Sequence, residues 1–236
     1  MINNIQMHYV EQAAEEAAAE SVADGAGEKG TVVLCHGFPM LWFSWHRQIP
    51  VLANAGYRVI APSMRGMGQS EAPEEPEAYG VDEITADLVG LLDHCGVDRA
   101  IFVGIDFGAF AIQDLALRHP ERVQAIICLE NPAAPHNPAK SPLTEYREMG
   151  EQHFLHIEYF REPPRADIEL AAAPREFLRK VMWILSGAAN YFDVFKHPPD
   201  TSYIDAMAEP PPLPWPWLSE LELEFFVSEY SQSGFT

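Results

Sequence analysis

Basic residues are scarce in this chain of 236 residues, which has 15 lysines and arginines against 35 aspartates and glutamates and a formal charge of −20. This excess of negative charge repels nucleic acid and anionic membrane surfaces, and it opposes the steering of an anionic substrate. The amino terminus has no basic cluster before an apolar core, and no apolar run is long enough to cross a bilayer. We therefore expect a soluble, cytoplasmic protein that binds neither nucleic acid nor membranes.

Cysteine is also rare, since only Cys35, Cys95 and Cys128 are present. Cys35 and Cys128 lie in apolar, strand-like runs, and Cys95 lies near the end of a helical stretch. An odd and scattered set of this kind is typical of reduced packing residues. The sequence thus predicts no disulfide framework, no metal site and no cofactor.

Short apolar runs alternate with helical patterns through the first half of the chain. The chain is 47% apolar and long enough to bury a sizeable core. Strands are predicted at 31–35, 57–61, 100–103 and 123–129, with helical spacing at 44–55, 81–94 and 109–117. Because each strand is short and continuously apolar, the pattern predicts an α/β fold with a mostly parallel sheet and helices on both faces. Residues 5–10 alternate and are predicted to form an edge strand.

The alternation stops near Asn131. Residues 133–236 contain helical segments, such as 175–187 and 218–232, separated by proline clusters, and no buried strand is predicted there. We interpret 1–132 as the amino-terminal part of an α/β core and 133–236 as a helical cap. Residues 11–30 are rich in alanine, glycine and acidic residues, which indicates a loose insertion without chemistry.

The stretch A-I-F-V-G-I-D-F-G, from Ala100 to Gly108, predicts a strand, a tight turn and a helix. Gly104 and Gly108 allow a strained turn without side-chain collisions, so Asp106 is predicted to project from the carboxyl end of the strand. A lone motif of this kind also fits an aspartate that caps a helix. Asp106 becomes a nucleophile candidate only together with the neighbouring motifs.

Two further motifs point to the same place. After the strand at 31–35, the amide of Phe38 in His-Gly-Phe-Pro could pair with that of Phe107 to form an oxyanion hole. Glu130 ends the next strand after Asp106, and carboxyl ends of adjacent parallel strands lie at one edge of a sheet. Glu130 is therefore predicted to orient a histidine beside Asp106, although alone it also fits a surface glutamate.

From about Thr31 onward, these motifs, together with W-F-S-W-H-R-Q-I-P, M-R-G-M-G-Q-S and H-P-E-R-V, resemble the α/β-hydrolase superfamily. Within it, the chain resembles the epoxide hydrolases and haloalkane dehalogenases, whose turn carries aspartate in place of serine. The resemblance implies that Asp106 attacks carbon to form an alkyl-enzyme ester. A water activated by histidine then attacks the ester carbonyl, which the two amides stabilise.

Opening of an epoxide needs hydrogen-bond donors above the aspartate. Family members commonly use two tyrosines, and H-F-L-H-I-E-Y-F-R-E-P at 153–163 has His156 at the position of the first. This resembles the Cif-type epoxide hydrolases, which pair a histidine with a tyrosine and take their acid from the Glu130 position. The resemblance implies that His156 is the donor, with His153 as the alternative and Tyr159 as a packing residue.

Haloalkane dehalogenases remain the alternative within the same ester chemistry. They commonly hold the halide with an indole after the nucleophile, where this chain has Phe107, with Phe38 opposite, and phenylalanine has no N–H donor. The sequence therefore favours hydrolysis of a small apolar epoxide to a vicinal diol. Trp42 and His36 are predicted to line the substrate pocket, Arg65 to anchor its loop, and a homo-oligomer is left open.

In the family, the chain returns from the cap to further strands and a general-base histidine, and a second cap tyrosine follows a motif that here reads S-G-F-T. Neither is present up to Thr236, so the resemblance implies truncation after the cap. Two hypotheses follow: the amino-terminal part of an epoxide hydrolase, or a non-catalytic, hydrolase-like binding module.

Overall fold

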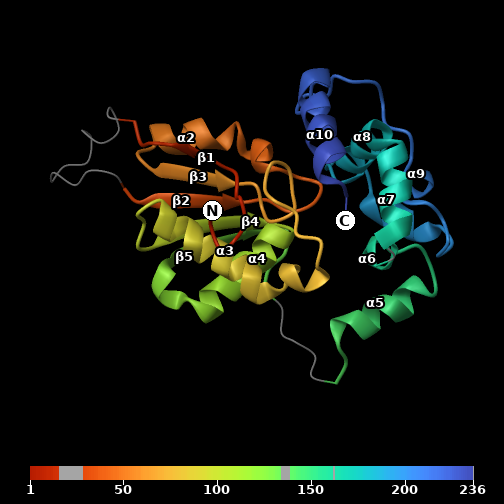
Figure 1. Ribbon diagram of the computed structural model, residues 1–236. Helices are drawn as coiled ribbons and strands as arrows, with labels where there is room; N and C mark the ends of the chain where they lie inside the picture. The colour runs from red at the N-terminus through yellow and green to blue at the C-terminus, as the bar shows by residue number, and fades with distance from the viewer. Residues whose placement is uncertain (16–28, 134–138, 162, 236) are drawn as a thin grey trace. The chain divides into compact units, whose positions relative to one another are not determined.

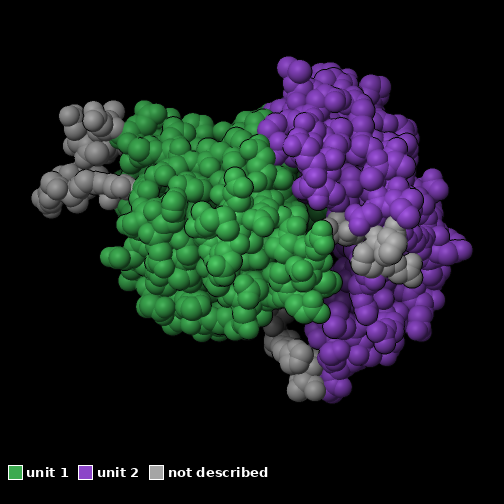
Figure 2. Space-filling view, in the orientation of Figure 1, with its two compact units in different colours: residues 1–133 green, residues 134–236 purple. Residues whose placement is uncertain are grey.

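The computed structural model describes residues 1–15, 29–133, 139–161 and 163–235. The chain divides into two compact units, Met1–Ala133 and Ala134–Thr236, which are coloured separately in Figure 2. Residues 16–28, most of the predicted loose insertion, lie outside the described residues. Each unit has its own set of elements and is described by itself.

The first unit contains a five-stranded sheet with the order β1-β3-β2-β4-β5 (Figure 1). Strand β1 pairs antiparallel with β3, and the other neighbours pair in parallel. The predicted mostly parallel sheet is thus confirmed. The strands are β1 (Tyr9–Gln12), β2 (Thr31–Cys35), β3 (Arg58–Pro62), β4 (Ala100–Ile105) and β5 (Val123–Leu129).

The edge strand predicted at residues 5–10 was wrong in position, because β1 begins only at Tyr9. The preceding segment turns back on itself in an isolated bridge between Ile2 and Ile5. Both isoleucines are buried, at 5% and 2% exposure, so their apolar spacing reflects burial in a turn and not a strand.

The helical segments of this unit include α3 at Val81–His94, the predicted range. The helix predicted at 44–55 is instead divided into a 3-10 turn and α2. Pro50 lies in the first turn of α2, where its missing N–H is tolerated, but it could not donate inside a continuous helix. The helices are η1 (Trp42–Trp45), α2 (Gln48–Asn54), η2 (Pro76–Tyr79), α3 (Val81–His94), α4 (Phe107–Arg118) and η3 (Pro120–Arg122).

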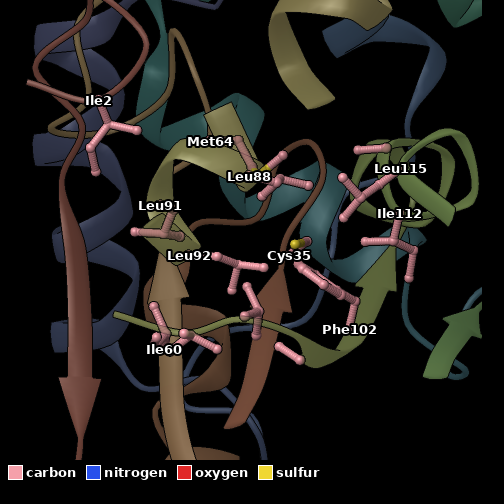
Figure 3. Packing of buried hydrophobic residues seen from close by; sticks show 14 residues of the cluster. Ile2, Cys35, Ile60, Met64, Leu88, Leu91, Leu92, Phe102, Ile112 and Leu115 are labelled. Carbon is pink, nitrogen blue, oxygen red and sulfur yellow. The ribbon is translucent and has the colours of Figure 1, made fainter. Parts of the chain in front are cut away.

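Two apolar layers cover the sheet, one on each face. Alternate residues of a strand point to opposite faces, so Val33 and Cys35 belong to one cluster while Val32 and Leu34 belong to the other. The first cluster contains leucines and isoleucines of α3 and α4 (Figure 3). The second contains Trp45 and residues of α2. The predicted arrangement of helices on both faces is confirmed.

Strand β5 lies last in the sheet order and differs from the buried β2. Three of its large apolar side chains are exposed, with Ile126 at 37%, Ile127 at 49% and Leu129 at 39%. Within the described part of the chain, no strand pairs with its outer edge. An apolar edge of this kind is open to pairing with a further strand.

The second unit is helical, and its one β-pairing among the described residues is an isolated bridge between Trp215 and Leu218. Tyr203 lies among aromatic rings of its core, with centroids 5.1 Å from Phe154, 5.7 Å from Tyr159 and 5.4 Å from Phe177. The helices are α5 (Pro142–Gly150), α6 (His156–Phe160), α7 (Pro163–Ala172), α8 (Pro174–Ile184), η4 (Tyr191–Lys196), α9 (Tyr203–Ala206) and α10 (Glu220–Ser233).

Candidate active site

Asp106 occupies the turn between β4 and α4 with φ 52° and ψ −124°. A positive φ is unfavourable for a residue with a Cβ, and a residue held in a sparsely populated backbone region costs about 1–3 kcal/mol. Such strain persists only where the surrounding structure imposes it, and it is concentrated at functional sites. The strand, strained turn and helix predicted around Asp106 are therefore present.

The glycines that flank Asp106 are required by close backbone contacts. A Cβ at Gly104 would lie 2.4 Å from the carbonyl oxygen of Gly108. A Cβ at Gly108 would lie 2.3 Å from the carbonyl oxygen of Cys35. Because only glycine fits at both positions, α4 can begin directly against the end of β2.

Two backbone amides surround the Asp106 carboxyl group. The N–H of Phe38 donates to Oδ1 of Asp106 over 2.8 Å, and the N–H of Phe107 also hydrogen-bonds to this carboxyl. These are the two amides predicted to form an oxyanion hole. If the carboxylate formed an ester, the same donors would adjoin its carbonyl oxygen, where negative charge develops during hydrolysis.

The environment of Asp106 raises the pKa of its carboxyl group. Burial is the larger cause, because it disfavours the charged form, while hydrogen bonds from the Phe107 and Phe38 amides lower the pKa. The balance makes the ionised carboxylate more basic than that of a solvated aspartate. A poorly hydrated carboxylate held by two donors is suited to attack on carbon.

Glu130 follows the last residue of β5 and has φ 73°. In the parallel register, Ile105 pairs with Leu129, so Asp106 and Glu130 are the next residues along the two strands. Glu130 is exposed overall, yet the pKa of its carboxyl group is raised. The larger cause is partial loss of solvent around this group, and the smaller cause is the negative charge of Asp106. The structure therefore brings these two carboxyl groups close enough for their charges to interact.

His36 is fully buried at the end of β2. Its Nε2 accepts a 2.9 Å hydrogen bond from the Met64 amide, so Nδ1 carries the hydrogen and donates to the carbonyl oxygen of Gly37 over 3.0 Å. Burial lowers the pKa of His36 to about 4, which keeps the ring neutral. His36 thus links the segment after β2 to the loop at Met64. These contacts favour a structural role for His36 over the predicted role in lining the substrate pocket.

Trp42, the other predicted pocket residue, lies in η1 and is half-buried. Its ring packs edge-on against Phe43 at 5.6 Å and lies 6.0 Å from His8. It also packs against the apolar cluster that contains Trp45. Part of the Trp42 side chain is thus packed and part is exposed, and its predicted contact with the substrate pocket stays a prediction.

Arg65 anchors its loop, as predicted, through a buried ion pair that the sequence analysis missed. Its Nε donates to Oδ2 of Asp87 over 2.7 Å, and a second nitrogen donates to Oδ1 over 2.5 Å. The side chains of Arg65 and Asp87 are 5% and 2% exposed. The available signal was an aspartate on the apolar face of the helix at 81–94, next to Leu88 and Leu91.

In the second unit, His156 is the first residue of α6 and hydrogen-bonds through Nδ1 to the hydroxyl group of Tyr191. Burial lowers the pKa of His156 to about 4. The alternative donor, His153, uses Nδ1 for a 2.9 Å hydrogen bond to the carbonyl oxygen of Phe154. Tyr159 is 4% exposed and packs against Phe154, which agrees with the interpretation of Tyr159 as a packing residue.

Metal-ligand clusters and membrane spans are both absent from the described ranges. No group of three or more histidine, cysteine, aspartate or glutamate side chains there could hold a metal ion. No helix in the same ranges has the length and apolar character needed to cross a membrane.

Comparison with known proteins identifies the family. Residues 30–164 match the family model of the alpha/beta hydrolase fold. The crystal structure of epoxide hydrolase A from Mycobacterium thermoresistibile aligns with a TM-score of 0.86 and 38% identity, over 100% of this chain and 70% of that one. The chain belongs to the epoxide hydrolases of the α/β-hydrolase fold. The predicted family and fold are thus confirmed.

Curated epoxide hydrolases agree with this assignment. Epoxide hydrolase A of Mycobacterium tuberculosis is 42% identical over 216 residues, which cover 89% of this chain and 66% of the relative. Epoxide hydrolase 1 of Siraitia grosvenorii is 36% identical over 89% of this chain and 64% of its own length. The chain therefore spans slightly less than two thirds of the length of those two relatives.

Proposed function

We propose that this chain carries the ester-forming half of an epoxide hydrolase reaction, with Asp106 as the nucleophile. The observation that carries the proposal is the Asp106 carboxyl group on its strained turn, bound by the Phe38 and Phe107 amides. An oxygen of Asp106 attacks an epoxide carbon, the ring C–O bond breaks, and its electron pair moves to the ring oxygen. A donor protonates that oxygen, which leaves a hydroxyalkyl ester on Asp106.

His156 is proposed to supply this proton. Its support is its position within H-F-L-H-I-E-Y-F, which matches the family's first donor, and its neutral imidazole. A neutral ring carries one N–H, and its lowered pKa of about 4 keeps it neutral near pH 7. His153 is less suited, because its Nδ1 donates to the Phe154 carbonyl oxygen, so a neutral His153 ring carries its one hydrogen there and has none on Nε2.

Glu130 is proposed to serve the second half-reaction, in which water attacks the ester carbonyl and releases the diol. Its carboxylate would orient a histidine that removes a proton from the water. Among the described residues of the first unit, no contact joins a histidine to Asp106.

The substrate class is proposed from the relatives, whose printed names are epoxide hydrolases. The formal charge of −20 disfavours anionic substrates, so a small neutral and apolar epoxide is the expected substrate. Dehalogenation is less well supported, because Phe107 and Phe38 have no side-chain N–H for a halide.

Intact-mass spectrometry after incubation with styrene oxide tests the proposal. The expected result is addition of one epoxide to the chain and its loss in Asp106→Asn, a variant that keeps the side-chain size. Asp98→Asn is the matched control, because Asp98 is exposed. The control should react like the wild type.

Epoxides also alkylate thiols, so the adduct must be located. Peptide mapping should place it at Asp106, and hydroxylamine should release it because it is an ester, whereas a thioether on Cys95 or Cys128 would remain. A folded chain without an Asp106 adduct would contradict the proposal and favour a binding module. An adduct formed with 1-bromobutane but not with styrene oxide would favour the dehalogenase alternative.

A further inference from the structure

In the second unit, the side chains of Tyr191 and His156 form a hydrogen-bonded pair. Tyr191 begins η4, and its hydroxyl group hydrogen-bonds to Nδ1 of His156 at the start of α6. The two rings are nearly perpendicular, at 82°, with centroids 5.5 Å apart. The contact therefore joins two elements that are distant in sequence.

The direction of this hydrogen bond follows from the acidity of the two groups. A phenol has a pKa near 10, and it is a much stronger acid than the N–H of a neutral imidazole. A neutral imidazole has one nitrogen that donates and one that accepts. The more stable arrangement therefore has the phenolic O–H donating to Nδ1.

Packing holds the imidazole in this arrangement. The His156 ring also stacks with Tyr203, with centroids 6.3 Å apart and ring planes 27° apart. Tyr191 in turn packs against Phe195 at 5.8 Å, and the Asn190 side chain accepts a hydrogen bond from the Phe192 amide at the start of η4. Both rings are thus restricted, so the hydrogen bond has a defined geometry.

We propose that Tyr191 is a positioning residue that fixes His156 in the tautomer with its hydrogen on Nε2, the nitrogen that then protonates the opened epoxide. This proposal rests on the proposed function. As the Nε2–H bond breaks and the new alcohol O–H bond forms, Nδ1 takes the phenolic proton of Tyr191. The histidine remains neutral and the tyrosine becomes a phenolate. The Nδ1 proton then returns to the phenolate while Nε2 takes a proton from water, which restores the starting tautomer.

This arrangement explains how a neutral histidine can act as an acid. Loss of a proton from an isolated neutral imidazole would leave an imidazolate, which is a strong base. Because the Tyr191 hydroxyl group is hydrogen-bonded to Nδ1, the negative charge ends on a phenolate, which is far more stable than an imidazolate. General acids of this kind typically contribute about 10²–10⁴-fold to a rate.

Nitrogen-15 NMR of the histidine-labelled chain tests the tautomer directly. His156→Gln assigns the resonances by removing them. In the wild type, Nε2 should give the signal of a protonated nitrogen and Nδ1 that of an unprotonated acceptor. Tyr191→Phe should shift this pattern toward a mixture of tautomers, whereas Tyr146→Phe, a matched change in the same unit, should not.

The rate of the styrene oxide reaction gives the second measurement. Tyr191→Phe should lower the rate of Asp106 ester formation by about 10-fold or more, while Tyr146→Phe leaves it unchanged. A hydrogen on Nδ1 in the wild type would overturn the proposal, whether or not the variant folds. An unchanged rate in Tyr191→Phe, when the wild type reacts, would also overturn it. If the wild type forms no ester, the proposed function fails, while the NMR result still decides the tautomer.

Discussion

The backbone N–H of Phe38 donates a 2.8 Å hydrogen bond to Oδ1 of Asp106, across a sequence separation of 68 residues. The contact exists because β2 and β4 are parallel neighbours, so the loop after β2 meets the turn after β4. Gly37 makes this approach feasible, since a Cβ there would lie 2.2 Å from Oδ1. The position of the Asp106 carboxyl group thus depends on a residue in a different loop.

Substitution Gly37→Ala should displace the Asp106 carboxyl group from the Phe38 amide. A misplacement of about 1 Å typically costs about 10²-fold in rate, and we expect a loss of this order in ester formation with styrene oxide. Time-resolved intact-mass spectrometry measures it. Gly187→Ala is the control, because a Cβ there has no neighbour within 4 Å. Equal rates in both variants would contradict the geometry at Gly37.

Substitution Gly108→Ala should destabilise the first unit, because the new Cβ would lie 2.3 Å from a backbone oxygen of β2. Overpacking against backbone typically costs about 1–3 kcal/mol or more. Urea unfolding followed by tryptophan fluorescence measures the free energy of unfolding. Gly80→Ala meets only an ordinary contact at 3.6 Å and should cost about 0.5 kcal/mol or less. A similar cost for the two variants would show that the turn relaxes.

The pKa of Glu130 should fall when Asp106 is replaced by asparagine. Loss of solvent and the negative charge of Asp106 both raise the pKa of Glu130, and Asp106→Asn removes the second cause. Asparagine also tolerates a positive φ better than most residues. Carbon-13 NMR titration of the Glu130 carboxyl group measures the change, with Asp98→Asn as control. No shift in Asp106→Asn would mean that the two charges do not interact.

Substitution Arg65→Ala should leave the Asp87 carboxylate buried without its main partner. Breaking a buried pair in this way typically costs about 3–5 kcal/mol, whereas Arg118→Ala, which removes an exposed pair with Asp82, should cost about 1 kcal/mol or less. Urea unfolding compares the two. The double variant Arg65→Met, Asp87→Leu should be less destabilised than Arg65→Ala, because no charge stays buried. The reverse order would refute this account.

The sequence by itself determined the local elements and the family. The strand at Thr31–Cys35, the helix at Val81–His94 and the strand at Val123–Leu129 have the predicted bounds, because apolar periodicity and turn residues act over a few neighbours. Gly104 and Gly108 likewise predicted the turn at Asp106, because turn residues act locally. The motifs also identified the epoxide hydrolases, which the comparisons confirmed. The roles of Asp106 and Glu130 stay predictions.

Only the tertiary structure decided which distant groups meet. Burial of His36 between two backbone partners, the ion pair of Arg65 with Asp87, and the hydrogen bond of Tyr191 to His156 have no local sequence signature. Each joins segments that the chain separates and that packing of the sheet or the helical unit brings together. Directional contacts of this kind depend on angles and distances of the folded backbone, which periodicity does not specify.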